Sequence, residues 1–246
     1  MSDLRKQIEE CERERRKLIT VPVCVRKKGE KLYYYTRRKV NGRISEHIIS
    51  EEEYQEFNDN NLKKILYGKK IELLKRKLDG FCDNSNKSRI ISCEILEIQK
   101  KLSQKPLPQF LEENDGRIYT TRRGEKVRSK SEVIIADALY SMGIYYEYEK
   151  PLLKGKYYPD FTIEFSPRGE TLYIEHFGML SSPEYVYQNL LKLIEYEKNG
   201  IISGHNLILT YEYYRPVPEK KIVEQICFDS SVIDQVIKRD ILPLSL

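Results

Sequence analysis

Cysteine and histidine are scarce in this sequence, and long apolar runs are missing. Five cysteines are scattered along 246 residues and never form a CxxC pair, so their spacing indicates neither a zinc site nor a disulfide framework. No apolar run approaches the roughly 18 residues that a membrane helix needs, and the N-terminus is charged from Asp3 to Lys17. We therefore expect no secretory signal, no membrane association and a cytoplasmic location.

Charge, by contrast, is abundant. Charged residues make up 33% of the chain and hydrophobic residues 40%, and the formal net charge is +5. This composition is typical of a soluble, mildly basic protein. The length suits one large domain or two small ones, and we expect two modules. The positive charge permits a nucleic-acid partner without requiring one.

The first fifty residues predict a helix and a three-stranded sheet. Residues 2–18 place apolar side chains near heptad spacing in a charged segment, which predicts a short helix that packs on its own chain or, alternatively, on a second copy in a homodimer. The segments VPVCVRK, KLYYYTRRKV and RISEHIIS follow, and Asn41-Gly42 is a strong hairpin signal. Tyrosines interleaved with cations in the middle segment can bind nucleic acid, but they also suit a half-buried strand, which is the interpretation we favour.

Two helices are expected next. Ser50 and Glu53 have the spacing of a capping box, and apolar residues recur at helical spacing from residue 51 to about residue 78. The same periodicity returns over residues 90–102. Together these segments predict an antiparallel helical hairpin.

A change in composition marks the predicted domain boundary. The segments KPLPQF and ENDG interrupt the helical periodicity between Ser103 and Gly116, because proline and turn-forming residues break helices. We expect an N-terminal module over residues 1–112, with a role in DNA binding or dimerisation, and a second domain over residues 113–246.

The stretch YYPDFTIEFSPRGETLYIEHFGM, residues 157–179, contains the most informative pattern. Two runs rich in β-branched and aromatic residues, 161–165 and 172–177, flank a turn-forming Ser-Pro-Arg-Gly segment, which predicts a β-hairpin. Asp160 heads the first run and Glu175 lies near the end of the second, so two carboxylates should lie on neighbouring strands. Their mutual repulsion and loss of water call for a compensating cation or a shared proton, and the cation we expect is a divalent metal.

Helices are predicted on both sides of this hairpin. RSKSEVIIADALYSMGI places Glu132 in a first turn, and SSPEYVYQNLLKLIEYEKNGI places Lys192 at mid-length. On Glu132, Pro159-Asp160 and Glu175, the segment from about residue 122 to residue 211 resembles the PD-(D/E)XK nuclease superfamily. The resemblance implies an α/β (α+β) fold with a restriction-endonuclease-like αβββαβ core around a central mixed sheet.

The superfamily pattern has a lysine two residues after the second acid, where this chain has Phe177. Some branches supply that lysine from the following helix, and Lys192 stands where a migrated lysine would be. The resemblance implies a metal-dependent endonuclease that hydrolyses phosphodiester bonds in DNA, with Mg²⁺ as cofactor and Mn²⁺ as a substitute. The implied catalytic residues are Asp160, Glu175, Lys192 and Glu132, and the implied metal ligands are Asp160, Glu175, Glu132 and the peptide carbonyl of His176.

Basic residues precede the Glu132 helix. We expect them at the mouth of the site, where cations can hold the phosphates that flank a scissile bond. They are Arg122, Arg123, Arg128 and Lys130. Beyond the second helix, HNLILTYEYYRP predicts a buried strand, and residues 218–240 predict one or two helices that cover the sheet.

Every candidate residue also has a structural interpretation. The alternative function for the whole chain is a catalytically inactive nuclease-like module that binds nucleic acid or a protein partner. The structural interpretations are turn chemistry for Asp160, an exposed edge strand for Glu175, a capping box with Ser129 for Glu132, a solvent-facing helix position for Lys192, and a packed neutral side chain for His176.

Overall fold

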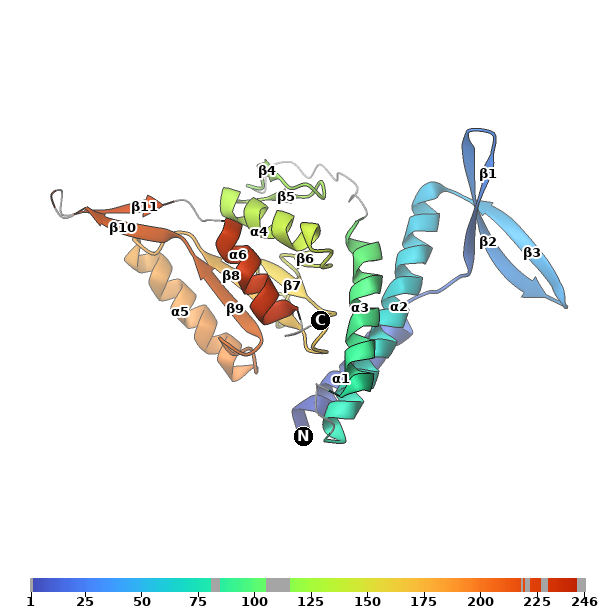
Figure 1. The fold of residues 1–246 in the computed structure, drawn as a ribbon, viewed down its shortest axis with the longest axis horizontal. Helices are drawn as coiled ribbons and strands as arrows, with labels where there is room; N and C mark the ends of the chain where they lie inside the picture. The colour runs from blue at the N-terminus through green and yellow to red at the C-terminus, as the bar shows by residue number, and fades with distance from the viewer. Residues whose placement is uncertain are drawn as a thin grey trace. The chain divides into compact units, whose positions relative to one another are not determined.

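The computed structural model describes residues 2–80, 85–104, 116–217, 219, 222–226 and 230–242. They belong to two compact units, Met1–Ile98 and Gln99–Leu246, each with helices and strands of its own (Figure 1). The fold is therefore mixed α and β, as the sequence predicts. The predicted boundary at residue 112 falls within residues 105–115, which lie outside the described part of the chain.

The first unit follows the predicted order of elements. Asn41 and Gly42 have φ values of 49° and 79°, as the primed hairpin turn between β2 and β3 requires. Ser50 and Glu53 form the predicted capping box. The elements are helix α1 (Ser2–Lys17), the antiparallel strands β1 (Val23–Lys28), β2 (Lys31–Val40) and β3 (Arg43–Ile49) in that order, helix α2 (Glu51–Leu78), and helix α3 (Asn86–Ser103), which continues into the second unit.

Helix α1 packs on its own chain. Lys75 Nζ of α2 lies 3.5 Å from Glu12 Oε1 of α1, and the apolar side chains of Ile8 and Cys11 are buried. The prediction that this helix packs on its own chain is therefore confirmed. Helix α2 also contacts α3, for example through an ion pair of 2.7 Å between Lys69 and Glu94.

The second unit contains a four-stranded mixed sheet. Strands β6, β7 and β8 form an antiparallel meander, and β9 then pairs parallel to β8. The order of helices and strands around this sheet is helix, three strands, helix, strand, as predicted. These elements are α4 (Lys130–Ser141), β6 (Glu147–Tyr148), β7 (Phe161–Ile163), β8 (Leu172–Phe177), α5 (Pro183–Lys198) and β9 (Leu207–Tyr211).

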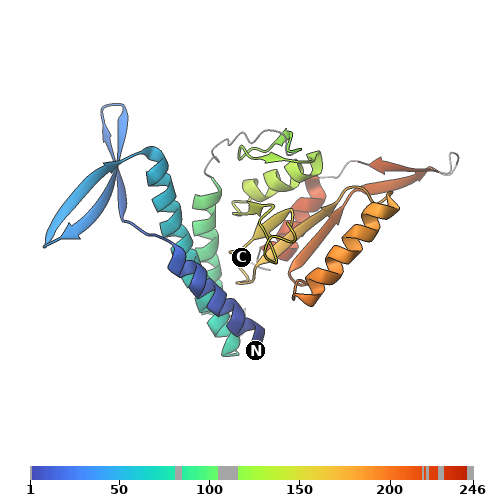
Figure 2. The same ribbon diagram turned by 180° about the vertical axis from the view of Figure 1, so that it is seen from behind.

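Helices cover both faces of this sheet (Figure 2). One face packs on α4 and on α6 (Ser230–Val236), and the resulting core includes Ile135, Phe161, Ile174 and Ile233. The other face packs on α5, where Tyr196 is fully buried against residues such as Tyr173. Because alternate strand residues point to opposite faces, Glu175 lies on the α5 side together with Tyr173.

The C-terminal part differs from the prediction in one respect. Strand β9 is followed by β10 (Tyr213–Val217), which pairs antiparallel with β11 (Ile222–Ile226), so the predicted helix is wrong over residues 222–226. A short apolar run has no decisive period of its own, and here the partner strand gives it a hydrogen-bonded ladder. The helical prediction is confirmed in α6 and in a π-helical segment, Ile237–Ile241.

A short hairpin of β4 (Tyr119–Thr120) and β5 (Lys126–Val127) precedes α4. Among the described residues, no helix combines the length and the apolar character that a membrane crossing requires.

Candidate active site

Asp160 and Glu175 lie on neighbouring strands, as the sequence predicts. Phe161 pairs with Ile174, so Asp160, just before β7, comes opposite Glu175 in β8. The main-chain N–H of His176 donates a hydrogen bond of 2.7 Å to Asp160 Oδ2. Asp160 is half-buried, and Glu175 is only 2% exposed. The hairpin therefore holds two poorly hydrated carboxylates side by side.

Burial raises the pKa of both carboxyl groups. The negative charge of Glu175 raises the pKa of Asp160 further, while the His176 N–H and the Lys192 charge act in the opposite direction. For Glu175, the ammonium of Lys192 and the hydroxyl of Tyr196 counteract the effect of burial on the pKa. Adjacent carboxyls with raised pKa values are typical of catalytic and metal-binding sites.

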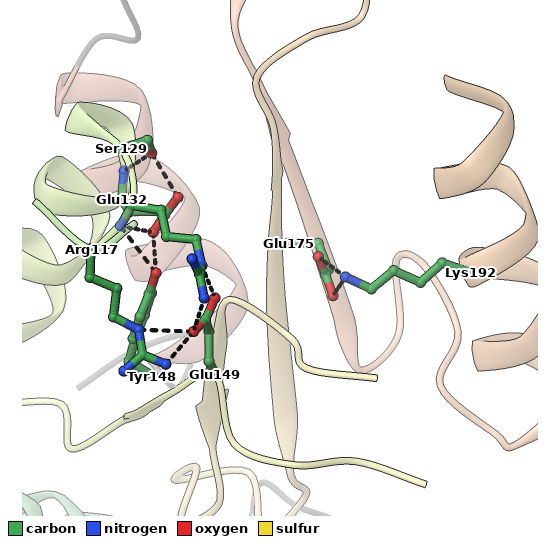
Figure 3. Close-up of polar contacts among 8 residues, drawn as sticks. Arg117, Ser129, Glu132, Tyr148, Glu149, Glu175 and Lys192 are labelled. Atoms are coloured by element: carbon green, nitrogen blue, oxygen red, sulfur yellow. Dashed lines mark hydrogen bonds and ion pairs between the residues drawn. The ribbon is translucent and has the colours of Figure 1, made fainter. Parts of the chain in front are cut away.

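Lys192 faces the strand and not the solvent. Its Nζ lies 2.6 Å from Glu175 Oε1 and its side chain is 20% exposed, as Figure 3 shows. Tyr196, one helical turn further along α5, donates a hydrogen bond of 2.8 Å to the same carboxylate. Tyr196 was not among the predicted site residues, although its spacing of four from Lys192 places both on one helix face. Phe177, at the usual position of the superfamily lysine, is 9% exposed.

Glu132 is engaged at the start of helix α4. Its main-chain N–H donates to the Ser129 hydroxyl at 3.1 Å, and that hydroxyl contacts Oε1 of Glu132 at 2.8 Å. The other oxygen, Oε2, accepts hydrogen bonds from the Tyr148 hydroxyl at 2.5 Å and from the Arg128 N–H at 3.0 Å. The predicted capping contact with Ser129 is therefore present, and both carboxylate oxygens are occupied.

Glu132 and Glu175 belong to separate groups of polar contacts (Figure 3). The charge of Glu132 still contributes to the raised pKa of Asp160. Within the described part of the chain, however, no three His, Cys, Asp or Glu side chains are grouped closely enough to hold a metal ion. The structure thus brings together Asp160, Glu175 and Lys192, and it does not add Glu132 to them.

The basic residues ahead of α4 differ in exposure. Arg123 is 5% exposed, donates to the Tyr146 carbonyl at 3.0 Å and pairs with Glu125 at 2.8 Å. It therefore does not present a cation at a site mouth, because burial and internal pairing give it a structural role. The other three are exposed: Arg122 pairs with Asp137, Arg128 pairs with Glu149, and Lys130 begins α4.

Glu149 lies beside the candidate site but was not among the site residues predicted from the sequence. Its carboxylate forms ion pairs with Arg117 at 2.6 Å and with Arg128 at 2.7 Å. Its main-chain N–H donates a hydrogen bond of 3.2 Å to the Asp160 carbonyl. The backbone of Glu149 has a positive φ of 45°, a value that residues other than glycine rarely adopt. The ion pairs of Glu149 join residues far apart in the chain, so they leave no local signal in the sequence.

The side chain of His176 is packed inside the second unit. Its ring nitrogens lie 3.0 Å from Thr210 Oγ1 and 3.3 Å from Glu212 Oε1, and Ser131 donates to that same Glu212 oxygen. Burial lowers the pKa of His176, although the charge of Glu212 opposes this. Strand alternation directs the ring away from Glu175, so the structural interpretation of this side chain is the one observed.

A comparison with known proteins adds little to this geometry. An uncharacterized protein of Methanocaldococcus jannaschii is 31% identical over 112 residues, a match that covers 39% of this chain and 9% of that protein. The chain thus spans less than a tenth of that relative's length. No family model matches the chain, and no solved structure matches it significantly.

Proposed function

We propose that the protein is a metal-dependent nuclease that hydrolyses phosphodiester bonds in DNA, with a centre of the PD-(D/E)XK type. One observation carries the proposal: two carboxylates from adjacent strands and a lysine from the following helix converge at Asp160, Glu175 and Lys192. The helix, strand meander, helix and parallel strand around them support it. The lysine that the resemblance expects at Phe177 is then supplied by Lys192.

The donor chemistry of this centre suits Mg²⁺. Magnesium is commonly bound through one or two carboxylates, with waters and substrate phosphate as the other ligands, so Asp160 and Glu175 suffice on the protein side. Burial raises both pKa values, and the adjacent charge of Glu175 raises that of Asp160 further, so a bound cation would stabilise the ionised pair. Mn²⁺ can substitute for Mg²⁺, and the peptide carbonyl of His176, the residue after Glu175 in β8, is a further oxygen donor. Bound metal would supply an activated water and stabilise charge on the phosphate.

The remaining roles fall to the chain's own groups. Lys192 carries a positive charge that can contact a phosphate oxygen or orient a water, while Tyr196 holds Glu175 in position from the same helix face. Glu132 is held by Ser129 at the start of α4 and by Tyr148 of β6, and it influences the centre by its charge. Arg128 and Lys130 are exposed cations near that helix end for flanking phosphates.

Cleavage of circular DNA tests the proposal. Purified full-length protein is incubated with supercoiled plasmid and with single-stranded circles in Mg²⁺, in Mn²⁺ and in EDTA. We expect cleavage with either metal, none in EDTA, and none by the Asp160→Asn variant. Asparagine keeps an oxygen to accept the His176 N–H, so this variant removes a charge with little change in shape. Cleavage by the variant at the parent rate would contradict the assignment.

A second candidate function is a nuclease-like module that binds nucleic acid without cutting it. It is favoured by Phe177 at the usual lysine position and by the lack of a third carboxylate grouped with the pair in the described residues. Metal-independent DNA binding by a folded protein that cleaves no substrate would support this alternative.

A further inference from the structure

The three-stranded sheet of the first unit has a net positive charge as large as that of the whole chain. Residues 23–49 contain eight lysines and arginines and two glutamates, a formal charge of +6 against +5 for the whole chain. The sheet is also largely exposed, since Thr36 alone among these residues is buried. A small sheet without a buried apolar face of its own gains little from hydrophobic burial, so its side chains are available for contacts outside the chain.

The two faces of this sheet differ. Directly paired residues of antiparallel strands share a face, and the pairs of Tyr34 define the face that meets α2, where the Tyr34 and Tyr54 rings lie 4.9 Å apart. The opposite face, which we call the basic face, points away from that contact. Along β2 its members recur every second residue, and the pairing adds members from β1. The basic face consists of Arg26, Lys28, Lys31, Arg37 and Lys39 together with Tyr33 and Tyr35.

Little negative charge balances the basic face. Glu46 pairs with both Arg26, at 2.7 Å, and Arg37, at 3.4 Å, so one carboxylate serves two guanidinium groups that are each more than half exposed. Within the described residues, no carboxylate pairs with Lys28, Lys31 or Lys39. The face therefore presents a row of exposed cations with one internal counter-charge.

Aromatic and apolar side chains lie among these cations. Tyr33 and Tyr35 are partly exposed, and the Arg26 guanidinium stacks over the Tyr35 ring at 5.3 Å. Ile44 and Ile48, which pair with Lys39 and Tyr35, are 57% and 70% exposed. An acidic protein partner would use only the positive charges of this face. Nucleic acid would use both features, because its phosphates can contact the cations and its bases can stack on the tyrosine rings.

We propose that the basic face binds the phosphate backbone of nucleic acid and forms a second DNA contact, separate from the centre at Asp160. The choice of DNA over RNA rests on the proposed function, while the contact itself rests on the charge and exposure of this sheet. The negative charge of phosphates that lie between the unpaired lysines relieves the repulsion among these lysines. The release of counterions on binding favours the complex further.

Binding measured in EDTA tests this proposal without cleavage. Full-length protein is titrated into fluorescein-labelled DNA, single-stranded or duplex, and the affinity is measured from anisotropy at several salt concentrations. The test variant is the double substitution Lys31→Gln and Lys39→Gln. A matched control removes the same charge at two exposed helix positions, Lys6→Gln and Lys101→Gln. Circular dichroism verifies that both variants are folded.

The slope of log K against log salt distinguishes a phosphate contact from a general effect of charge. We expect the test variant to lower the affinity about tenfold or more and the slope by about 1.8 for duplex, or about 1.4 for single strands, if each lysine neutralises one phosphate. The control should keep the parent slope. An unchanged slope and affinity in the test variant, an equal loss in the control, or no binding to either DNA would overturn the proposal.

This outcome can be told apart from failure of the nuclease assignment. Binding in EDTA requires no cleavage, so the affinity and salt slope of the Lys31→Gln and Lys39→Gln variant report on the basic face independently of catalysis at Asp160. A protein that binds through the basic face yet cleaves nothing would retain this inference and lose the proposed catalytic function.

Discussion

The ammonium of Lys192 lies 2.6 Å from the Glu175 carboxylate and joins helix α5 to strand β8. Glu175 is almost fully buried, and a buried carboxylate without a cation costs several kcal/mol. The lysine that we assign to the chemistry therefore also stabilises the fold. Substitutions at this pair must be examined for stability as well as for activity.

Replacing Lys192 by methionine should destabilise the protein by about 3–5 kcal/mol near pH 8, because it leaves a buried carboxylate unpaired. The loss should shrink as the pH falls and Glu175 takes up a proton. Urea denaturation of the parent and the variant at several pH values measures both effects. Lys198→Met on the same helix breaks only an exposed pair with Glu195 and should cost less than about 1 kcal/mol. Equal losses in the two variants would contradict this account.

The contribution of Asp160 and Glu175 to the stability of the metal-free protein should fall as the pH rises above the ordinary carboxyl values of 3.8 and 4.5. The folded pKa values of Asp160 and Glu175 are raised, so the folded state holds protons that the unfolded state has released, and stability is lost as the pH passes through the folded pKa. Each unit of difference between the folded and unfolded pKa is worth about 1.4 kcal/mol.

The Asp160→Asn variant removes one of these groups. In EDTA it should be more stable than the parent at pH 8, and the difference should disappear near pH 3. Urea denaturation of the parent and the variant at pH 8 and at pH 3 measures this difference in stability. A variant less stable than the parent at pH 8 would show that the carboxylate pair is not strained.

Divalent metal should stabilise the parent protein. A ligand that binds the folded state at ten times its Kd adds about 1.4 kcal/mol, which thermal denaturation with and without Mg²⁺ detects. The gain should be lost in Asp160→Asn and should persist in Glu197→Gln, which alters an exposed glutamate of α5. Equal gains in both variants would indicate metal binding elsewhere.

Glu132→Gln should affect stability more than chemistry. The amide can still accept a hydrogen bond from Tyr148, but it loses an acceptor for Ser129 or Arg128, at a cost of about 1–2 kcal/mol. Below the unfolding temperature we expect DNA cleavage within about threefold of the parent rate, since Glu132 lies outside the group at Glu175. A thousandfold loss of cleavage in a folded variant would make Glu132 part of the catalytic centre.

Features with a local physical cause could be predicted from the sequence. The turn at Asn41-Gly42 requires left-handed backbone, and Ser50 with Glu53 satisfies a helix N-terminus; both signals lie within four residues. The hairpin that brings Asp160 opposite Glu175 was likewise predictable, because turn chemistry separates two apolar runs. Such local signals were sufficient to predict most helices and strands and the placement of the two carboxylates on neighbouring strands.

Features that depend on distant partners could not be predicted. Arg123 and Arg128 look equivalent in the sequence, yet one is buried against Tyr146 and the other is exposed beside Glu149. Strand β11 exists because β10 is there to pair with it. In each case the deciding contact joins residues far apart in the chain, and neither periodicity nor spacing reports it.

The most direct test of the central claim is a double-mutant comparison of metal-dependent DNA cleavage. Groups that act as one catalytic unit give non-additive losses. We therefore predict that Asp160→Asn and Glu175→Gln each reduce the cleavage rate by about a thousandfold or more, that the double variant is no worse than either, and that Glu197→Gln cleaves normally. Small losses that multiply in the double variant, or parent-like cleavage by either single variant, would contradict a shared catalytic centre at Asp160 and Glu175.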